Sequence, residues 1–200
     1  MVFYRIVRAI ASLVVRLLTR FRVRGLANIP ARGPCIIAAN HFHALDPLML
    51  AIAVRRPTCF MAKEEILRWP IFGWLVRRVG VFPVKRGKVD VQAFRRSLEI
   101  LGRDGALGIF PEGTRSKTGE MQEALNGAAL LSARTGSPIV PVALAGHYRL
   151  GGVVKVKIGP PIYIACATAG KPTPEERVAG TKLLTEHIAE LLTQCKDESW

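Results

Sequence analysis

The sequence is poor in cysteine and lacks the short motifs of several large enzyme classes. Its four cysteines form no C-x-x-C pair, and none lies near a histidine at the spacing of zinc ligands. We therefore expect neither a disulfide framework nor a zinc site, and a reducing cytosolic setting fits better. The G-x-S-x-G elbow, the Walker P-loop, the G-x-G-x-x-G fingerprint and the H-E-x-x-H metal motif are also missing. These absences favour a chemistry without a covalent intermediate, a metal or a cofactor.

Acidic residues are scarce, and none occurs before Asp46. The 29 lysines and arginines against 15 aspartates and glutamates give the 200-residue chain a net charge of +14. Such an excess predicts an anionic partner: a nucleic acid, a phospholipid surface or a phosphate-rich small molecule. Nucleic acid is disfavoured, because no recognised binding motif is present and aromatic residues make up only 7% of the chain. A non-catalytic basic protein that binds a membrane surface remains an alternative.

No apolar run near the N-terminus reaches the roughly 20 residues that span a bilayer. Residues 3–21 are apolar but are interrupted by Arg5, Arg8, Arg16 and Arg20, and they contain no signal cleavage site. At helical period these arginines share one narrow arc, and apolar side chains fill the rest. We expect an amphipathic helix in the membrane interface, with its arginines toward lipid phosphates. An ordinary helix packed on the domain is the alternative, and the two are compatible.

Beyond this segment, short apolar strands alternate with helices. Strands are expected at 35–39, 57–61, 79–84, 106–110, 139–144 and 153–158. Helices are expected at 46–54, 90–102, 126–135 and 174–195, and a helix broken at Pro70 and Gly73 at 63–79. Asp46, followed by Pro47, and Asp90 are expected N-caps. This order predicts an α/β class: a single domain with a mostly parallel central sheet flanked by helices.

Three of the expected strands end in polar loops. Residues 40–46 follow the first strand, residues 85–87 follow the third, and residues 111–116 follow the fourth. In open α/β sheets, ligands bind beyond the carboxyl ends of the strands. If these strands are parallel, the three loops therefore converge on one edge of the sheet, which is the predicted site.

The first loop holds a candidate general base. His41 and Asp46 lie five positions apart, which allows the carboxylate to fold back toward the imidazole. Such an aspartate fixes the tautomer of a histidine and stabilises the imidazolium that forms when the ring takes a proton. Alternatively, Asp46 serves only as a helix cap and His41 is incidental.

The other two loops supply candidate groups for binding phosphate. Arginine offers a rigid fork that suits phosphate, and glycine and threonine supply backbone and hydroxyl donors. Solvated surface charge is the alternative for each cation. Glu112 either holds Arg115 or caps a turn, and His43 and His147 are expected to be ordinary loop residues. The candidate phosphate ligands are Lys85, Arg86, Gly113, Thr114 and Arg115.

Together these loops resemble those of the lysophosphatidic acid acyltransferase family, within the glycerolipid acyltransferases. The family's N-H-x4-D motif is matched at 40–46, and its G-x-x-P-x-x-R motif at 80–86. The F-P-E-G-T-R-S motif is complete at 110–116, and a V-P-V element stands at 140–142. The order and spacing also fit, and the similarity spans about residues 24 to 165.

The resemblance implies a direct acyl transfer without a metal or cofactor. His41 would deprotonate the sn-2 hydroxyl of 1-acyl-glycerol-3-phosphate, which would attack an acyl thioester, while Asp46 would orient His41. The donor would be acyl-CoA or acyl-carrier protein, and the product phosphatidic acid. The acceptor phosphate would be bound by Arg115 with Arg86 and Lys85, in a site shaped by Glu112 and Gly113, with Thr114 among the substrate-binding residues.

The amphipathic pattern of the N-terminal segment and the resemblance together imply a division of the chain and a place in the cell; some relatives carry two N-terminal membrane helices, whereas only one is evident here. Residues 1–24 would form an amphipathic membrane helix, and residues 25–200 the glycerolipid acyltransferase domain. The protein would sit on the cytoplasmic face of the cell membrane as a peripheral or monotopic protein. Its partners would be the phospholipid surface, a lysophospholipid acceptor and the acyl donor.

The sequence departs from the family's pattern at two positions. His43 stands where the family often has serine or threonine, and Asn126 where a lysine often precedes a glycine. The second departure weakens the expectation of a further phosphate contact there. Because the motifs concern only the phosphate and the hydroxyl, another acceptor is an alternative, such as a lyso-ornithine lipid or a lysophospholipid in remodelling. A hydrolase that passes the acyl group to water is a further alternative.

Overall fold

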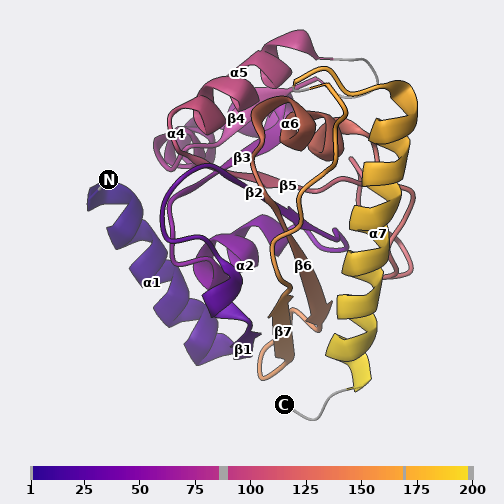
Figure 1. Ribbon diagram of the computed structural model, residues 1–200. Helices are drawn as coiled ribbons and strands as arrows, with labels where there is room; N and C mark the ends of the chain where they lie inside the picture. The colour runs from indigo at the N-terminus through magenta and orange to yellow at the C-terminus, as the bar shows by residue number, and fades with distance from the viewer. Residues whose placement is uncertain (1, 86–89, 169, 198–200) are drawn as a thin grey trace.

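The computed structural model describes residues 2–85, 90–168 and 170–197. Within these residues, a seven-stranded sheet lies between helices on both of its faces (Figure 1). The strands are β1 (Arg20–Arg24), β2 (Cys35–Ala39), β3 (Thr58–Lys63), β4 (Phe82–Val84), β5 (Ala106–Ile109), β6 (Ile139–Gly146) and β7 (Val153–Ile158). The helices are α1 (Val2–Leu18), α2 (Asp46–Ala53), α3 (Glu64–Leu67), α4 (Pro70–Arg78), α5 (Val91–Gly102), α6 (Gly127–Thr135) and α7 (Pro174–Asp197), with a short 3-10 turn at Leu26–Asn28.

The sheet order is β1-β7-β6-β2-β5-β3-β4. Strands β6, β2, β5, β3 and β4 are parallel to one another, β7 is antiparallel to β6, and β1 is parallel to β7. The predicted α/β class with a mostly parallel sheet is therefore confirmed. Because β2, β4 and β5 are parallel, their carboxyl ends lie at one edge, as expected for the three polar loops.

The sheet is the middle layer of three. Helices α1 and α2 lie on one side, and α5, α6 and α7 cover the other (Figure 1). Strand β2 is buried along its whole length: Ile37 belongs to the core under α2, and Ile36 to the core under α5 and α6. Burial on both faces explains why β2 reads as an unbroken apolar run. It also makes β2 a rigid base for the loop that follows it.

The N-terminal segment differs from expectation. The expected helix over 3–21 ends at Leu18, and residues 20–24 form the edge strand β1. Phe21 is buried in the core, because alternation along β1 turns it away from the arginines on either side. Arg20 donates its backbone N–H to Gly152 O at 2.8 Å, which joins β1 to the start of β7. At residues 20–24 the alternation of arginine and apolar residues therefore produces a strand, and the helix expected from the apolar spacing does not continue.

The helices from residue 63 onward also differ in detail. The break falls at Arg68 and Trp69, and Pro70 begins α4, so the prediction of an interruption at Gly73 is wrong. Gly73 lies inside α4 against the backbone of Leu67, where a Cβ would come within 2.2 Å of a carbonyl oxygen. The predicted cap of α5 is confirmed, since Asp90 accepts hydrogen bonds from two backbone N–H groups of the first turn.

Helix α1 buries only a narrow stripe against the domain. Tyr4 and Val15 are buried, and the Tyr4 hydroxyl donates to Arg56 O at 3.4 Å. Within the described residues, no helix combines the length and apolar character needed to cross a bilayer. The large apolar side chains that α1 leaves exposed are Val2, Phe3, Ile6, Ile10, Leu13, Val14, Leu17 and Leu18.

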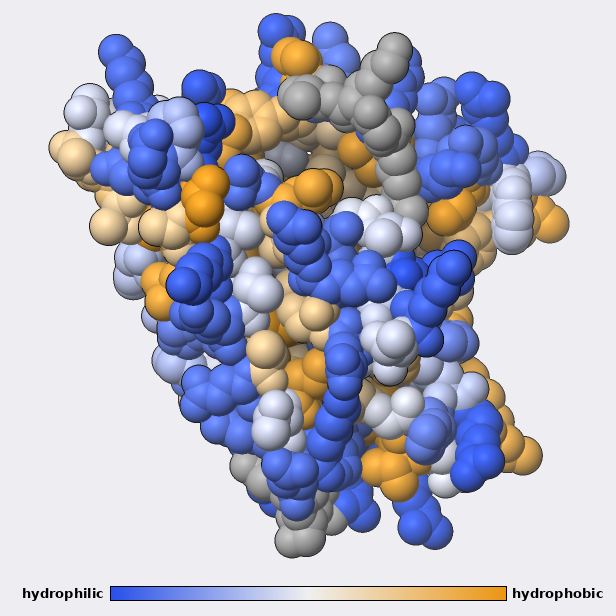
Figure 2. All heavy atoms as spheres, turned by 90° about the vertical axis from the view of Figure 1, so that its right-hand side faces the viewer, coloured by the Kyte–Doolittle hydropathy of each residue, from blue (hydrophilic) through white to orange (hydrophobic). Residues whose placement is uncertain are grey.

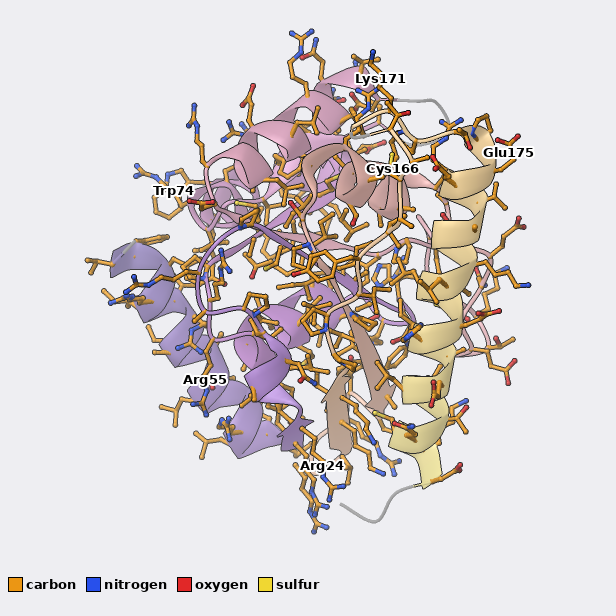
Figure 3. The ribbon with its side chains drawn as sticks, viewed as in Figure 1. Arg24, Arg55, Trp74, Cys166, Lys171 and Glu175 are labelled. Atoms are coloured by element: carbon orange, nitrogen blue, oxygen red, sulfur yellow. The ribbon has the colours of Figure 1, made fainter. Side chains whose placement is uncertain are left out.

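A second exposed apolar group extends this surface. The Phe3 and Trp74 rings meet edge to face at 5.9 Å, and Figure 3 shows Trp74 beside the N-terminal end of α1. The side of the molecule that carries α7 is, in contrast, largely hydrophilic, with scattered apolar patches (Figure 2). We call the face formed by the exposed apolar side chains of α1 and those near α4 the α1–α4 surface. Its members outside α1 are Ile66, Trp69, Ile71, Phe72 and Trp74.

Candidate active site

The site begins where β2 ends, between β5 and β6. The buried Asn40 side chain continues the pairing of β2 with β6 past the last strand residue. Its Nδ2 donates to Leu144 O at 2.9 Å, and its Oδ1 accepts from Leu144 N at 2.7 Å. These two bonds replace a rung of the sheet, so the point at which His41 leaves the strand is fixed.

The carboxylate of Asp46 organises the loop that follows. It is fully buried and accepts four hydrogen bonds. Oδ2 lies 2.8 Å from His41 Nδ1 and accepts the backbone N–H groups of Phe42 and His43, each at 2.7 Å. Oδ1 accepts the hydroxyl of Tyr148 at 2.6 Å. The pairing of His41 with Asp46 that the spacing allowed is therefore present.

The expectation that Asp46 is the N-cap of α2 is wrong. The capping position is Leu45, which makes no side-chain cap, and Asp46 is the first residue of the helix, followed by Pro47. Its carboxylate points back into the loop, where both oxygens are already engaged. A charge removed from water needs such a full set of donors, and the loop supplies more of them than the first turn of α2 does.

The imidazole of His41 is held in one orientation. Its side chain is 10% exposed, and its ring stacks on Phe110 with the ring centres 4.3 Å apart. A carboxylate at Nδ1 can only accept, so Nδ1 carries the proton and Nε2 keeps its lone pair. The ring can therefore take a second proton at Nε2, with a buried negative charge behind it.

The loop after β5 holds the backbone of His41 on both sides. Glu112 Oε1 accepts the His41 N–H at 2.7 Å, and Ser116 N donates to His41 O at 2.7 Å. Glu112 is buried, and its other oxygen accepts from Gln122 N at 3.2 Å. Burial raises the pKa of Glu112, although these backbone donors offset part of the effect. Glu112 was expected either to hold Arg115 or to cap a turn. In the described residues it makes no hydrogen bond or ion pair with Arg115, and both of its oxygens bind backbone N–H groups instead.

The candidate phosphate ligands follow Glu112 directly. Gly113 has a φ of +66°, a conformation that favours glycine, and a Cβ there would approach Leu125 to 2.9 Å. Thr114 and Arg115 are exposed. Among the described residues, no hydrogen bond or ion pair occupies the Arg115 guanidinium. This turn therefore presents a glycine, a hydroxyl and an unoccupied cation next to the residue that holds His41.

The second motif lies farther away. Lys85 is exposed and follows β4, which is three strand spacings from β2, or roughly 14 Å along the sheet edge. Its backbone N–H donates to Asp90 Oδ2 at 2.8 Å. Arg86 lies outside the described residues. The structure thus brings together His41, Asp46 and Glu112, with residues 113–115 beside them, and leaves Lys85 at the periphery.

One residue of the site was not foreseen from the sequence. Tyr148 lies in the loop after β6, and its ring packs 5.3 Å from Phe42 and 4.5 Å from His43, measured between ring centres. His43 Nδ1 also accepts the Leu45 N–H at 3.2 Å, whereas His147 is exposed. Tyr148 is 102 positions from Asp46. The only sequence signal for it would have been the pairing of β6 with β2, which places their following loops side by side.

A cavity of about 450 Å³ lies next to the His41 loop. It begins at Phe42 and is bounded by the end of β6, the start of β7 and the last turns of α7. Leu144 and Leu192 form part of its wall, together with Lys196. In the part of the chain that the structure describes, no cluster of three or more histidine, cysteine or acidic side chains is arranged to hold a metal.

Comparison with known proteins bears on the family. A family model described as Acyltransferase matches residues 20–145, which include all four motifs. A chloroplastic 1-acyl-sn-glycerol-3-phosphate acyltransferase of Brassica napus is 33% identical over 154 residues, or 70% of this chain and 44% of that protein. The lyso-ornithine lipid O-acyltransferase of Pseudomonas aeruginosa is 38% identical over 136 residues, or 66% of this chain and 50% of that protein. The chain thus spans about half the length of these relatives.

A solved structure shares the fold. The 1-acyl-sn-glycerophosphate acyltransferase PlsC from Thermotoga maritima gives a TM-score of 0.81, covering 98% of this chain and 81% of that chain. The sequence identity is 24%. The arrangement of sheet and helices described above is therefore one that a known protein adopts.

The buried carboxylate of Glu112 leads to a prediction about stability. In Glu112→Gln an amide NH2 replaces one acceptor oxygen, so either the His41 or the Gln122 backbone N–H loses its partner. An unsatisfied buried donor costs about 1–3 kcal/mol, and we expect the free energy of unfolding to fall by this amount near pH 5. Urea denaturation followed by circular dichroism measures it. The matched control is Glu123→Gln, an exposed position, which should change stability by less than about 0.5 kcal/mol.

The difference in stability between the wild type and Glu112→Gln should also depend on pH, with a sign that follows from the pKa of Glu112. Burial raises the pKa of Glu112 above its ordinary value of 4.5, so the folded protein keeps the proton to a higher pH than the unfolded chain does. Unfolding in this window releases a proton, and the contribution of Glu112 to stability falls as the pH rises. Glutamine does not titrate, so the variant has no such fall in stability. The difference in unfolding free energy between the wild type and Glu112→Gln should therefore shrink between about pH 4.5 and pH 7. A deficit that grows over this range would contradict the raised pKa.

Proposed function

The chain belongs to the acyltransferase family whose model matches residues 20–145, and from this premise we propose that it transfers a fatty acyl group from a thioester to the sn-2 hydroxyl of 1-acyl-glycerol-3-phosphate. The product is phosphatidic acid. The observation that carries the proposal is the 2.8 Å hydrogen bond from His41 Nδ1 to the buried Asp46 carboxylate, near an exposed Arg115. The named activity of the Brassica napus relative supports this choice of acceptor.

The reaction is a direct transfer with His41 as general base. The acceptor hydroxyl gives its proton to His41 Nε2 while its oxygen attacks the thioester carbonyl carbon. The carbon–sulfur bond then breaks, and the departing sulfur takes the proton back from the imidazolium. An ester and a free thiol result, and His41 returns to its starting state. Asp46 stabilises the imidazolium while it lasts, because its carboxylate is already hydrogen-bonded to Nδ1.

The acceptor phosphate binds on the turn after Glu112. The Arg115 guanidinium pairs with the phosphate and the Thr114 hydroxyl donates to it. The Gly113 N–H already donates to Phe110 O at 3.0 Å, so Gly113 shapes the turn and the backbone donor expected of it is not available to the phosphate. Lys85 contributes charge from the periphery of the site, and the positive charge of Arg86, which lies outside the described residues, adds to the attraction of the anionic lipid. The donor is acyl-CoA or acyl-carrier protein, and no metal or cofactor takes part.

The protein acts at the cytoplasmic face of the cell membrane as a peripheral or monotopic protein, through the α1–α4 surface. The exposed apolar side chains of α1, which include Leu13 and Leu17, form a face that can enter the boundary between headgroups and acyl chains. Aromatic residues of α4 extend this face, and Arg78 lies 5.5 Å from the Trp74 ring. Apolar burial together with arginines near anionic phosphates is the combination that binds helices to lipid surfaces.

A different acceptor is the second candidate. The lyso-ornithine lipid acyltransferase of Pseudomonas aeruginosa is the observation that favours it. Such a lipid offers a hydroxyl but no phosphate, so Arg115 would lose its proposed partner. Comparing wild-type kcat/KM for the two acceptors, with palmitoyl-CoA as donor, decides between them. Thiol release without any lipid product would instead indicate a hydrolase.

The role of His41 gives the first activity prediction. His41→Ala should lower kcat by roughly 10²- to 10⁴-fold, the usual contribution of a general base, while the protein remains folded. Thiol release from palmitoyl-CoA in the presence of 1-acyl-glycerol-3-phosphate measures turnover, and circular dichroism verifies folding. His187→Ala is the control, because this histidine lies on α7 and, among the residues that the structure describes, bonds only to Leu183 O of its own helix. Near-normal turnover by folded His41→Ala would rule out the mechanism.

The role of Arg115 gives the second. Arg115→Ala should raise KM for 1-acyl-glycerol-3-phosphate, since a lost charge-assisted contact costs about 1.5–3 kcal/mol, or roughly 10- to 150-fold. With monoacylglycerol, which lacks the phosphate, the effect should stay below about twofold. Arg103→Ala is the matched control: Arg103 is exposed and precedes β5, at the opposite edge of the sheet. Equal losses with both acceptors would indicate a structural role for Arg115.

The α1–α4 surface gives the third. Changing Leu13, Val14 and Leu17 to serine removes exposed apolar area and leaves every arginine in place. Cosedimentation with neutral vesicles should be lost, whereas part of the binding to anionic vesicles should remain and weaken with salt. Val178 and Leu183 on α7, changed to serine together, form the control. If the triple variant sediments like the wild type, α1 serves only to pack against the domain.

A further inference from the structure

Tyr148 makes the one contact that completes the hydrogen bonding of Asp46. Its hydroxyl donates to Asp46 Oδ1 at 2.6 Å, whereas the three other donors all go to Oδ2. Asp46 is fully buried, so with the hydroxyl in place Oδ1 is out of contact with bulk solvent. Burial beside the carboxylate also raises the pKa of Tyr148, so its hydroxyl keeps the proton that it donates.

The surroundings hold the Tyr148 ring in place independently of that bond. The ring packs against Phe42 and His43, the two residues that follow His41 in the loop. The loop that carries Tyr148 is itself fixed, because Gly151 N donates to Leu18 O and Arg20 N donates to Gly152 O, each at 2.8 Å. The hydroxyl is thus delivered from a rigid frame, as a group that orients another needs to be.

We propose that Tyr148 is a positioning residue for the transfer reaction, which sets the orientation and charge of the Asp46 carboxylate toward His41. With its hydroxyl in place, Oδ1 is satisfied, and rotation about Cβ–Cγ that would turn Oδ1 toward the imidazole loses a hydrogen bond. The hydroxyl also draws negative charge toward Oδ1. The bond from His41 Nδ1 to Oδ2 is therefore held in one geometry, which matters most when the ring is an imidazolium.

This inference rests on the proposed function for its kinetic part, but it has a consequence that needs no activity. A carboxylate that loses one donor becomes a stronger acceptor for those that remain. In Tyr148→Phe the ring stays and only the hydroxyl is lost, so the His41 Nδ1 proton should move downfield in the ¹H NMR spectrum. Replacing tyrosine by 3-fluorotyrosine makes the hydroxyl a stronger donor, so the same proton should move upfield. The resonance is identified by its loss in His41→Ala.

The kinetic expectation separates positioning from substrate binding. Tyr148→Phe should lower kcat roughly tenfold, equivalent to about 1.4 kcal/mol in the activation barrier, and should leave KM for the acceptor within about twofold. Tyr163→Phe is the matched control, since Tyr163 is 68% exposed and loses the same atom. It should change neither the turnover nor the Nδ1 proton resonance.

Each outcome has a distinct meaning. Opposite displacements of the proton resonance in the two substitutions, with the kcat loss, support the proposal. A resonance that stays in place in both would overturn it, whatever the kinetics show. A rise in KM with unchanged kcat would also overturn it, because Tyr148 would then contact substrate. If the wild type transfers no acyl group, the proposed function fails, yet the two NMR measurements still decide whether Tyr148 acts on the Asp46–His41 pair. If Tyr148→Phe does not fold, the fluorotyrosine measurement decides alone.

Discussion

The site depends on the full burial of one carboxylate. Asp46 is inaccessible to water, and such a charge is stable only where several donors converge on it. Those donors come from the loop after β2 and from the loop after β6, so both loops must adopt compatible conformations around the same two oxygens. The carboxylate therefore does more than orient His41. It stabilises the fold of the loop that carries His41, and through Tyr148 it connects that loop to the loop after β6.

The neighbours of β2 in the sheet complete this arrangement. On one side, the Asn40 side chain continues the ladder with β6. On the other, Glu112 and Ser116 from the loop after β5 bind the N–H and the C=O of His41. A histidine whose backbone and ring are both constrained loses little conformational freedom when a substrate arrives, which is the condition for efficient proton transfer in a fixed geometry.

Local signals predicted well, and signals that depend on distant partners did not. The cap of α5 by Asp90 and the apolar strand β2 follow from short stretches of sequence, and both are present. Strand β1 was missed because its alternation lasts five residues and needs β7, far along the chain, to become a strand. Asp46 before Pro47 has the local pattern of a cap, and only the donors around it decide otherwise. Tyr148 could not be found from any local pattern, because its partner is 102 positions away.

The short connection between α1 and the sheet has a consequence for modularity. A single residue, Thr19, separates the end of α1 from β1, and the Leu18 carbonyl is bound by the same loop that carries Tyr148. If α1 attaches the protein to lipid as proposed, the membrane-binding helix is part of the folded domain and is not a separate module on a flexible linker. A foreign anchor grafted in its place would also have to put a backbone carbonyl where Leu18 has it, because that carbonyl supports the loop that carries Tyr148. A change in α1 would then affect both membrane attachment and the loop that contacts Asp46.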